Sequence, residues 1–362
     1  MGAETTAAFV AVEAPVIVGL QPSALVDHMA RVDWSVLHIP GETGGSLPVA
    51  IEELEYILSQ VKIHLQSSNG QSPLKTIAGG SVANTIRGLA SGFGITCGII
   101  GACGNDEQGE LFLQNMKYNN VNLSNLIAKK GATAQCVCLV DGTGNRTMRP
   151  CLSSAVRLQA DDLRGDHFRG SKWLVLRYGI FNLEVIHAAV RIAKQEQVLV
   201  SLDLASFEMV RNFRQPLLEL LESGNVDLCF ANEDEAKEVV RGEGEGHTDP
   251  EAALDYLGTR CKWAVVTLGS KGCIAKHGNQ VVRVPALGET QVSDATGAGD
   301  LFASGFLYGL LKGLSLEDCC KVGACSGGSV IRSLGGEVSQ ENRHWMYKQM
   351  QINGLSVPEL GL

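Results

Sequence analysis

Short apolar runs alternate along the chain with longer segments of helical periodicity. Seven runs have the length and β-branched character of strands, at Pro15–Leu20, Cys97–Ile100, Cys136–Val140, Trp173–Leu176, Val198–Leu204, Val226–Phe230 and Trp263–Leu268. Helical periods lie between most of them, at Ile51–Leu65, Val82–Ser91, Glu107–Tyr118, Leu183–Gln195, Glu233–Arg241 and Glu251–Arg260. The alternation predicts an α/β fold whose helices cover both faces of a mostly parallel sheet. The ligand of such a sheet binds outside the carboxyl ends of its strands.

Two stretches interrupt this alternation and predict β structure outside the main sheet. They are Asp33–Val49, which contains GETGGS, and Ala134–Pro150, in which Asp141–Gly144 has the composition of a hairpin turn. We expect residues 31–50 and 134–150 to form a small β lid over the ligand edge. Residues 1–30, 51–133 and 151–362 then form the large domain that binds nucleotide and substrate.

Composition narrows the class of protein. Of 362 residues, 45% are hydrophobic and 19% are charged, as in a globular protein, and a net charge of −9 disfavours nucleic acid or anionic membrane as a partner. The eleven cysteines include no CxxC pair, which predicts reduced thiols and no zinc site. The first residues lack the basic and apolar pattern of a leader, so we expect a cytoplasmic protein, either a monomer or a homodimer.

The segment Asp294–Asp300 (DATGAGD) precedes an apolar helical period and is the sharpest motif. Gly297, Ala298 and Gly299 leave backbone N–H groups exposed at the positive end of a helix, which is a binding site for phosphate. Asp300 would weaken the binding of a resting anion, but it can take a proton from a hydroxyl that attacks phosphorus. The alternative is that these glycines, and those that follow at a spacing of four, only allow close helix packing.

A second glycine segment also precedes a helix. Gly79 and Gly80 let the backbone approach a ligand, and Asn84 presents an amide one turn later, which suits a polyhydroxyl ligand. The alternative is a plain helix start capped by Ser81. Asp27 follows the first strand and can accept hydrogen bonds from two neighbouring hydroxyls, although an aspartate there is commonly a turn residue.

The segment Asn232–Glu235 (NEDE) follows the strand VDLCFA. Its oxygens lie at the carboxyl end of a strand, where a magnesium ion could be held. The alternative is an acidic helix start that interacts with the helix dipole without a metal. Arg177 follows another strand and could reach a base or a phosphate, or form a surface ion pair.

Taken together, four segments resemble the motifs of the ribokinase-like (PfkB) family of sugar and nucleoside kinases, in the family's order. They are GGSVANT, NEDE, TLGSKG and DATGAGDLFASGF, and the last departs from the family only at Ala295. The resemblance implies a three-layer α/β/α fold with a small β lid, and ATP with Mg²⁺. It also implies that Asp300 is the general base, and that the backbone of Gly297, Ala298 and Gly299 forms the anion hole.

The same resemblance implies the remaining site residues. Asn232, Thr267, Gly269 and Gly272 would bind ATP, and Glu235 would hold Mg²⁺ through water. Asp27, Gly79, Gly80 and Asn84 would bind the acceptor. Asp294 and Ser339 match the positions of a K⁺ site found in many members.

Within the family, SALVDHMARVD, GGS and NRTM resemble the adenosine-kinase-like branch. The resemblance implies transfer to the primary 5′-hydroxyl of a purine nucleoside. Ser23 replaces the asparagine usual in that branch, so inosine, guanosine and free sugars or polyols such as ribose, fructose and inositol remain open as acceptors. A silent nucleotide-binding regulator is the alternative from another class, and the intact Asp300 and glycine motif argue against it.

Overall fold

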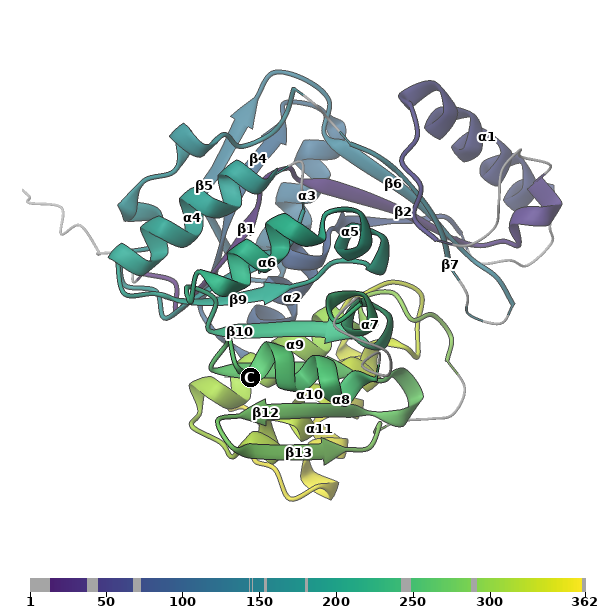
Figure 1. Cartoon of the computed structure of the whole chain (residues 1–362). Coiled ribbons are helices and arrows are strands. Elements are labelled where there is room, and N and C mark those ends of the chain that lie inside the picture. Colours follow the sequence, from purple (N-terminus) through teal and green to yellow (C-terminus); the bar gives the residue numbers. More distant parts are fainter. Residues whose placement is uncertain are drawn as a thin grey trace, which may run out of the picture.

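The computed structural model describes residues 14–37, 45–67, 73–142, 144, 146–152, 155–179, 182–241, 249–287 and 292–359. Within these ranges the strands form two sheets, one of nine strands and one of four. Figure 1 shows the four-stranded sheet projecting to one side of the larger body. We call the two the large sheet and the small sheet.

The large sheet has the strand order β13-β12-β11-β10-β9-β8-β1-β4-β5. Seven strands run parallel to their neighbours: β1 (Ile17–Gln21), β4 (Cys97–Gly104), β5 (Val121–Lys129), β8 (Trp173–Arg177), β9 (Leu199–Asp203), β10 (Leu228–Asn232) and β11 (Trp263–Thr267). An antiparallel edge is added by β12 (Cys273–His277) and β13 (Gln280–Val284). The predicted mostly parallel α/β architecture is confirmed.

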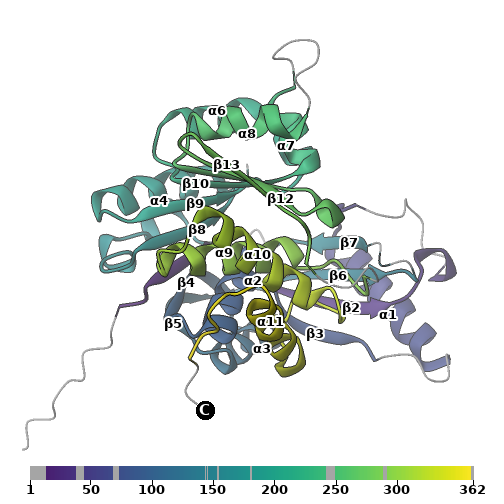
Figure 2. The same cartoon turned by 90° about the horizontal axis from the view of Figure 1, so that it is seen from below.

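Helices cover both faces of the large sheet (Figure 2). One face packs against α4 (Leu183–Gln195), α5 (Phe207–Asn212), α6 (Arg214–Glu222), α7 (Glu233–Val239) and α8 (Pro250–Gly258). The other packs against α2 (Ser81–Arg87), α3 (Glu107–Tyr118), α9 (Ala298–Leu311), α10 (Leu316–Val330) and α11 (Gln340–Ile352). Alternate strand residues serve the two cores: in β8, Trp173 and Val175 face one core, and Leu174 and Leu176 face the other.

The small sheet has the order β3-β2-β6-β7, built from β2 (Leu25–Arg31), β3 (Lys75–Gly79), β6 (Ala134–Val140) and β7 (Arg146–Cys151). The predicted hairpin is confirmed by the antiparallel pairing of β6 with β7. Helix α1 (Ile51–Ser67) covers one face, where its Leu54, Ile57 and Val61 are buried against the sheet. The chain leaves the large sheet at the end of β1 and enters the small sheet in β2.

The predicted boundaries of the small β unit are wrong in two respects. Strands β2 and β3 belong to the small sheet, although the sequence analysis assigned them to the large domain. Asp33–Val49 instead contributes a 3₁₀ helix at Trp34–Leu37 and a single bridge between Ser46 and Met148, while residues 38–44 lie outside the described ranges. The strand β2 was missed because Asp27 and His28 interrupt its apolar pattern, although the fold buries both.

All eleven cysteines are free thiols, and all except the half-buried Cys151 are buried, as the absence of CxxC pairs predicted. Among the helices described, none combines the length and the apolar character needed to cross a membrane.

Candidate active site

Five adjacent strands of the large sheet each end in a polar residue. In each strand, the alternation of side chains places this residue on the face of the sheet that α9 covers. Residues two or four positions earlier, such as Val175 in β8 and Phe230 in β10, pack in the same core as Phe302 and Phe306 of α9. Side chains alternate along a strand, so the terminal residues continue this face to the carboxyl edge. We call them the polar row: Gln21, Arg177, Asp203, Asn232 and Thr267.

Two pairs of neighbours within the polar row are in register. Arg177 pairs with Asp203 across β8 and β9, and Asn232 pairs with Thr267 across β10 and β11. The row therefore spans the edge at which a parallel α/β sheet binds its ligand. Sequence analysis identified three of its members but missed Gln21 and Asp203. The sequence signal for these two residues is a polar residue at the end of an apolar strand.

Helix α9 begins beside this row. Gly297 caps it with a φ of +76°, and a Cβ there would lie 2.7 Å from the Cα of Gly336, so this position requires glycine. The N–H groups of Gly297 and Gly299 have no acceptor among the described residues, whereas the N–H of Ala298 donates to Ala295 at 3.3 Å. Gly299 is exposed. The helix start thus presents free donors to an anion.

The packing alternative accounts for other glycines of α9. A Cβ on Gly305 would lie 2.6 Å from the carbonyl oxygen of Val322, and one on Gly309 would lie 2.8 Å from the sulfur of Cys319, so both glycines allow α10 to approach. A Cβ on Gly299 would meet nothing within 4 Å. Close helix packing therefore explains the middle of α9 and leaves Gly299 at its start unexplained.

Asp300 lies in the first turn of α9 and is half-buried. Its Oδ2 accepts a hydrogen bond from Asn84 Nδ2 at 2.9 Å. Burial raises the pKa of this carboxyl, Arg177 and the Asn84 amide lower it, and Asp203 raises it. A carboxylate with a raised pKa is a better proton acceptor than an exposed aspartate.

A buried arginine orients the Asn84 amide. Arg87 is fully buried, and its Nη2 donates to Asn84 Oδ1 at 2.7 Å, while its Nη1 donates to Ala78 O at 2.8 Å and to Asn115 Oδ1 at 2.7 Å. A guanidinium only donates, so the amide oxygen of Asn84 faces Arg87 and the amide nitrogen faces Asp300. No motif or periodicity in the sequence pointed to this arginine, which is the last residue of α2.

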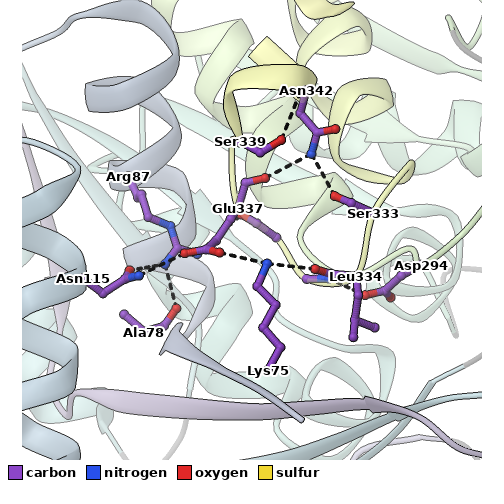
Figure 3. A network of polar contacts seen from close by, with 12 residues as sticks. Lys75, Ala78, Arg87, Asn115, Asp294, Ser333, Leu334, Glu337, Ser339 and Asn342 are labelled. Carbon is purple, nitrogen blue, oxygen red and sulfur yellow. Dashed lines mark hydrogen bonds and ion pairs between the residues drawn. The ribbon is translucent and has the colours of Figure 1, made fainter. Parts of the chain in front are cut away.

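The network around Arg87 continues to the segment that follows α10 (Figure 3). Glu337 accepts from Asn115 Nδ2 at 2.9 Å and forms an ion pair of 2.9 Å with Lys75 of β3. Lys75 also donates to Leu334 O at 3.1 Å. The network therefore connects the small sheet with the helices that carry Asn84 and Asp300.

The predicted acceptor residues come together where the two sheets meet. A Cβ on Gly79 would lie 2.2 Å from an Asp27 oxygen, so the absence of a side chain makes room for the carboxylate. Gly80 is the N-cap of α2, and Ser81 makes no capping bond there, so the interpretation of Ser81 as the cap is wrong. Asp27 is buried, and burial raises its pKa to about 7, although Arg87 acts in the opposite direction.

Asn232 caps α7, and its side chain accepts hydrogen bonds from the N–H groups of Asp234 and Glu235. Glu235 in turn accepts from the N–H and Nδ2 of Asn232 at 2.8 and 2.7 Å, so the alternative of an acidic helix start is observed. Glu235 is also buried, which, together with the charge of Asp203, raises its pKa to about 8. Burial and the nearby Asp203 thus both favour the neutral form of Glu235, and a Mg²⁺ site at Glu235 stays a prediction.

The remaining predicted residues lie on either side of this cluster. Gly269 and Gly272 flank the turn between β11 and β12, next to Thr267 of the polar row. Asp294 is fully buried and accepts from Thr296 N, Thr296 Oγ1 and Gly335 N, whereas Ser339 caps α11. In the described chain no hydrogen bond joins Asp294 with Ser339, and a K⁺ site formed by the two stays a prediction.

Comparisons with known proteins agree with this geometry. The family model "pfkB family carbohydrate kinase" matches residues 49–343. An uncharacterized sugar kinase of Archaeoglobus fulgidus is 28% identical over 250 residues, which cover 68% of this chain and 95% of that protein. A nucleoside kinase of Methanocaldococcus jannaschii is 25% identical over 295 residues, 78% of this chain and 88% of that one.

The fold agrees equally well with a solved structure. The crystal structure of adenosine kinase from Sinorhizobium meliloti has a TM-score of 0.80 and 30% identity, and the match covers 92% of this chain and 99% of that one. The chain belongs to the pfkB family of carbohydrate kinases and is a phosphotransferase that acts on an alcohol group of a small sugar or nucleoside, with ATP and a divalent metal ion.

Proposed function

We propose that this kinase transfers the γ-phosphoryl group of ATP to the 5′-hydroxyl of a purine nucleoside, with Asp300 as the general base. The observation that carries the proposal is the position of the Asp300 carboxylate, which is tied to Asn84 and lies beside the free N–H groups that begin α9. A base and an anion site side by side are what the attack of a hydroxyl on a phosphoryl group requires.

In the proposed reaction, Asp300 takes the proton of the acceptor hydroxyl as its oxygen forms a bond to the γ-phosphorus. The bond from phosphorus to the bridging oxygen breaks, and ADP leaves with that electron pair. The backbone donors of Gly297, Ala298 and Gly299 stabilise the charge of the transferring group, with Ala298 releasing its bond to Ala295. Glu235 would hold Mg²⁺ through water, and the ion would supply positive charge beside the phosphates.

ATP would lie along the side of the polar row that is formed by β10 and β11. We assign Asn232, Thr267, Gly269 and Gly272 to its binding, because they lie together at the edge next to α9. K⁺ held by Asp294 and Ser339 would support the loop before α9. This assignment rests on the sequence resemblance and on the neighbouring positions of these residues in the structure.

The acceptor would lie between the two sheets, with its ribose hydroxyls on Asp27, Asn84 and the backbone of Gly79 and Gly80. Beside Asp27 the small sheet carries an apolar, sulfur-containing cluster in which Met29, Ile77, Cys136 and Cys138 are buried. Leu25 and Met148 are partly exposed members of this cluster. A flat base gains more from such a surface than a free sugar does. The similarity to an adenosine kinase and to a nucleoside kinase supports the same choice.

The test is an ADP-release assay on the purified protein with ATP, Mg²⁺ and K⁺. Adenosine, inosine and guanosine are compared with ribose, fructose and inositol, and the Asp300→Asn variant controls for a contaminating kinase. We expect a nucleoside to give the highest kcat/KM and a 5′-monophosphate by phosphorus NMR. Turnover of free sugars alone would refute the nucleoside assignment and leave the role of Asp300 in place.

A free sugar is the second candidate acceptor. The observation in its favour is the similarity to the sugar kinase of Archaeoglobus fulgidus, which spans nearly the whole length of that protein. Both candidate acceptors would contact Asp27, Gly80 and Asn84. The apolar cluster of the small sheet is therefore the feature that would favour a nucleoside over a free sugar.

A further inference from the structure

Arg177 brings a positive charge to the centre of the polar row. It ends β8, pairs with Asp203 on β9, and lines the same small cavity as Asp203 and Asp300. The sequence predicts that this arginine either contacts a ligand or forms a surface ion pair. The side chain is exposed but forms no ion pair within the described residues, so the surface ion pair is not observed.

The charges facing Arg177 come from three different elements. Asp203 ends β9, Glu235 lies in α7 and Asp300 lies in α9, and the charge of Arg177 lowers the pKa of all three carboxyl groups against the effect of their burial. A phosphoryl group that approached Asp300 would meet these carboxylates as well as the backbone donors at the start of α9. Like charges within a few ångströms repel strongly in a partly buried site, so transfer at this position requires a nearby cation.

One contact holds the guanidinium in place and leaves the rest of it available. Nη2 donates to the carbonyl oxygen of Ala205 at 2.6 Å, and no other described residue accepts from this side chain. Ala205 itself has a φ of +75°, and its N–H donates to Asp203 Oδ1 at 2.9 Å. An alanine in this conformation is strained, and strained backbone is frequent at functional sites. The turn after β9 therefore positions the guanidinium, while most of its five N–H donors have no acceptor among the described residues.

We propose that Arg177 binds the transferring phosphoryl group and stabilises its charge during transfer, a role that rests on the proposed function. The planar fork of a guanidinium matches two oxygens of one phosphoryl group. The group would lie between Arg177 and the first turn of α9, with Asp300 on the side of the acceptor. Arg177 thus serves as a catalytic residue, and no bond to it forms or breaks.

The first test is equilibrium binding by calorimetry, which needs no acceptor. Wild type, Arg177→Met and Arg177→Lys are titrated with the Mg²⁺ complexes of AMP-PNP and of ADP, which differ in the terminal phosphoryl group. We expect Arg177→Met to weaken AMP-PNP binding ~10-fold or more, to leave ADP binding within about twofold, and Arg177→Lys to fall between. Arg169→Met, which removes another exposed arginine, serves as the matched control and should change neither affinity.

An equal loss for both nucleotides would show that Arg177 only supports the turn at Ala205 and would overturn the proposal, as would unchanged binding of both. Thermal unfolding of each variant separates a loss of fold from a loss of contact. If the wild type binds neither nucleotide, the proposed function itself fails, which is a different result.

Turnover provides the second test, with the best acceptor found in the ADP-release assay. We expect Arg177→Met to lower kcat ~10²–10⁴-fold with little change in the KM of the acceptor. Added ethylguanidinium should restore part of the rate, because it can take the vacated position. An increase in the acceptor KM at unchanged kcat would mean that Arg177 recognises the acceptor instead, and would contradict the proposal.

Discussion

Buried charge is the main feature of the site at the scale of single residues. Arg87 is fully buried, and Asp27 and Glu235 are nearly so. Arg87 and Glu235 form hydrogen bonds with neighbouring polar groups, and Asp27 is influenced by the charge of Arg87. Removing such charged groups from water is costly unless hydrogen bonds compensate. The arrangement of these groups therefore depends on all of their polar neighbours being present. The orientation of Asn84 by Arg87 is one example, because it directs the amide nitrogen to Asp300.

Asp27 makes stability depend on pH. Its pKa rises from an ordinary value of 3.8 to about 7 in the folded protein, mainly through burial. The folded state therefore holds a proton that the unfolded chain releases between about pH 4 and 7, and the contribution of Asp27 to stability falls as the pH rises through this window. Asp27→Asn removes the dependence. In urea unfolding, the free energy of unfolding of Asp27→Asn minus that of wild type should rise by about 1–4 kcal/mol between pH 4 and pH 8.

A difference between the two proteins that stays constant with pH would contradict the raised pKa of Asp27. Glu235, whose pKa is also raised, is present in both proteins, so its contribution cancels from the comparison.

The site residues that belong to a sequence motif could be predicted. The site residues whose surroundings depend on tertiary packing could not. Gly297, Asp300 and Asn232 lie in short segments whose spacing reflects local backbone geometry at a helix start. Arg87 acquires its surroundings only when distant elements pack, so nothing near it in the chain marks it. Asp203 carries only the weak signal of a polar residue at the end of an apolar strand.

At the scale of elements, strongly periodic segments were predicted well. The helices Glu107–Tyr118 and Leu183–Gln195 have the predicted bounds, but the helix predicted at Val82–Ser91 ends at Arg87 and continues as a π turn, Gly88–Gly92. Helix α10 was missed because glycine, serine and cysteine, which are weak helix formers, make up much of it. Its packing against α9, through Gly305 and Gly309, compensates for that weakness.

The start of α9 gives a matched pair of substitutions. Gly297→Ala forces a side chain into a left-handed conformation and against the backbone of Gly336, so we expect it to lose ~2–4 kcal/mol of stability and to lower kcat at least tenfold. Gly299→Ala has open space and an ordinary φ, and should unfold within ~1 kcal/mol of wild type. Chemical unfolding of both variants checks this. Equal stability would contradict the geometry assigned to the helix start.

At the scale of the whole molecule, the ion pair between Lys75 and Glu337 joins the small sheet to the segment that follows α10 (Figure 3). Lys75 belongs to the small sheet, whereas Glu337 lies in the segment after α10 that also supports Gly297 through Gly336. Movement of the small sheet over the acceptor would close the site and exclude water, as a lid does in many kinases. If the acceptor binds on the small sheet as proposed, this ion pair links its position to the helix start.

Glu337→Gln should weaken this link. Neutralising Glu337 removes a charge that compensates the buried Arg87, so we expect a loss of ~1–3 kcal/mol and a higher acceptor KM. Glu251→Gln, which breaks an exposed ion pair with Arg283, is the matched control and should change stability by less than ~0.5 kcal/mol. Urea unfolding and acceptor titration measure both effects. Equal behaviour of the two variants would mean that the ion pair does not couple the sheets.

The most direct test of the account is the turnover of Asp300→Asn. Asparagine keeps the size of the side chain but cannot accept the proton of the hydroxyl, so kcat should fall ~10²–10⁴-fold while the affinity for ATP stays within about threefold. The measurement pairs single-turnover kinetics with calorimetric titration of ATP. A kcat within threefold of wild type would show that Asp300 is not the base, and would contradict the central claim.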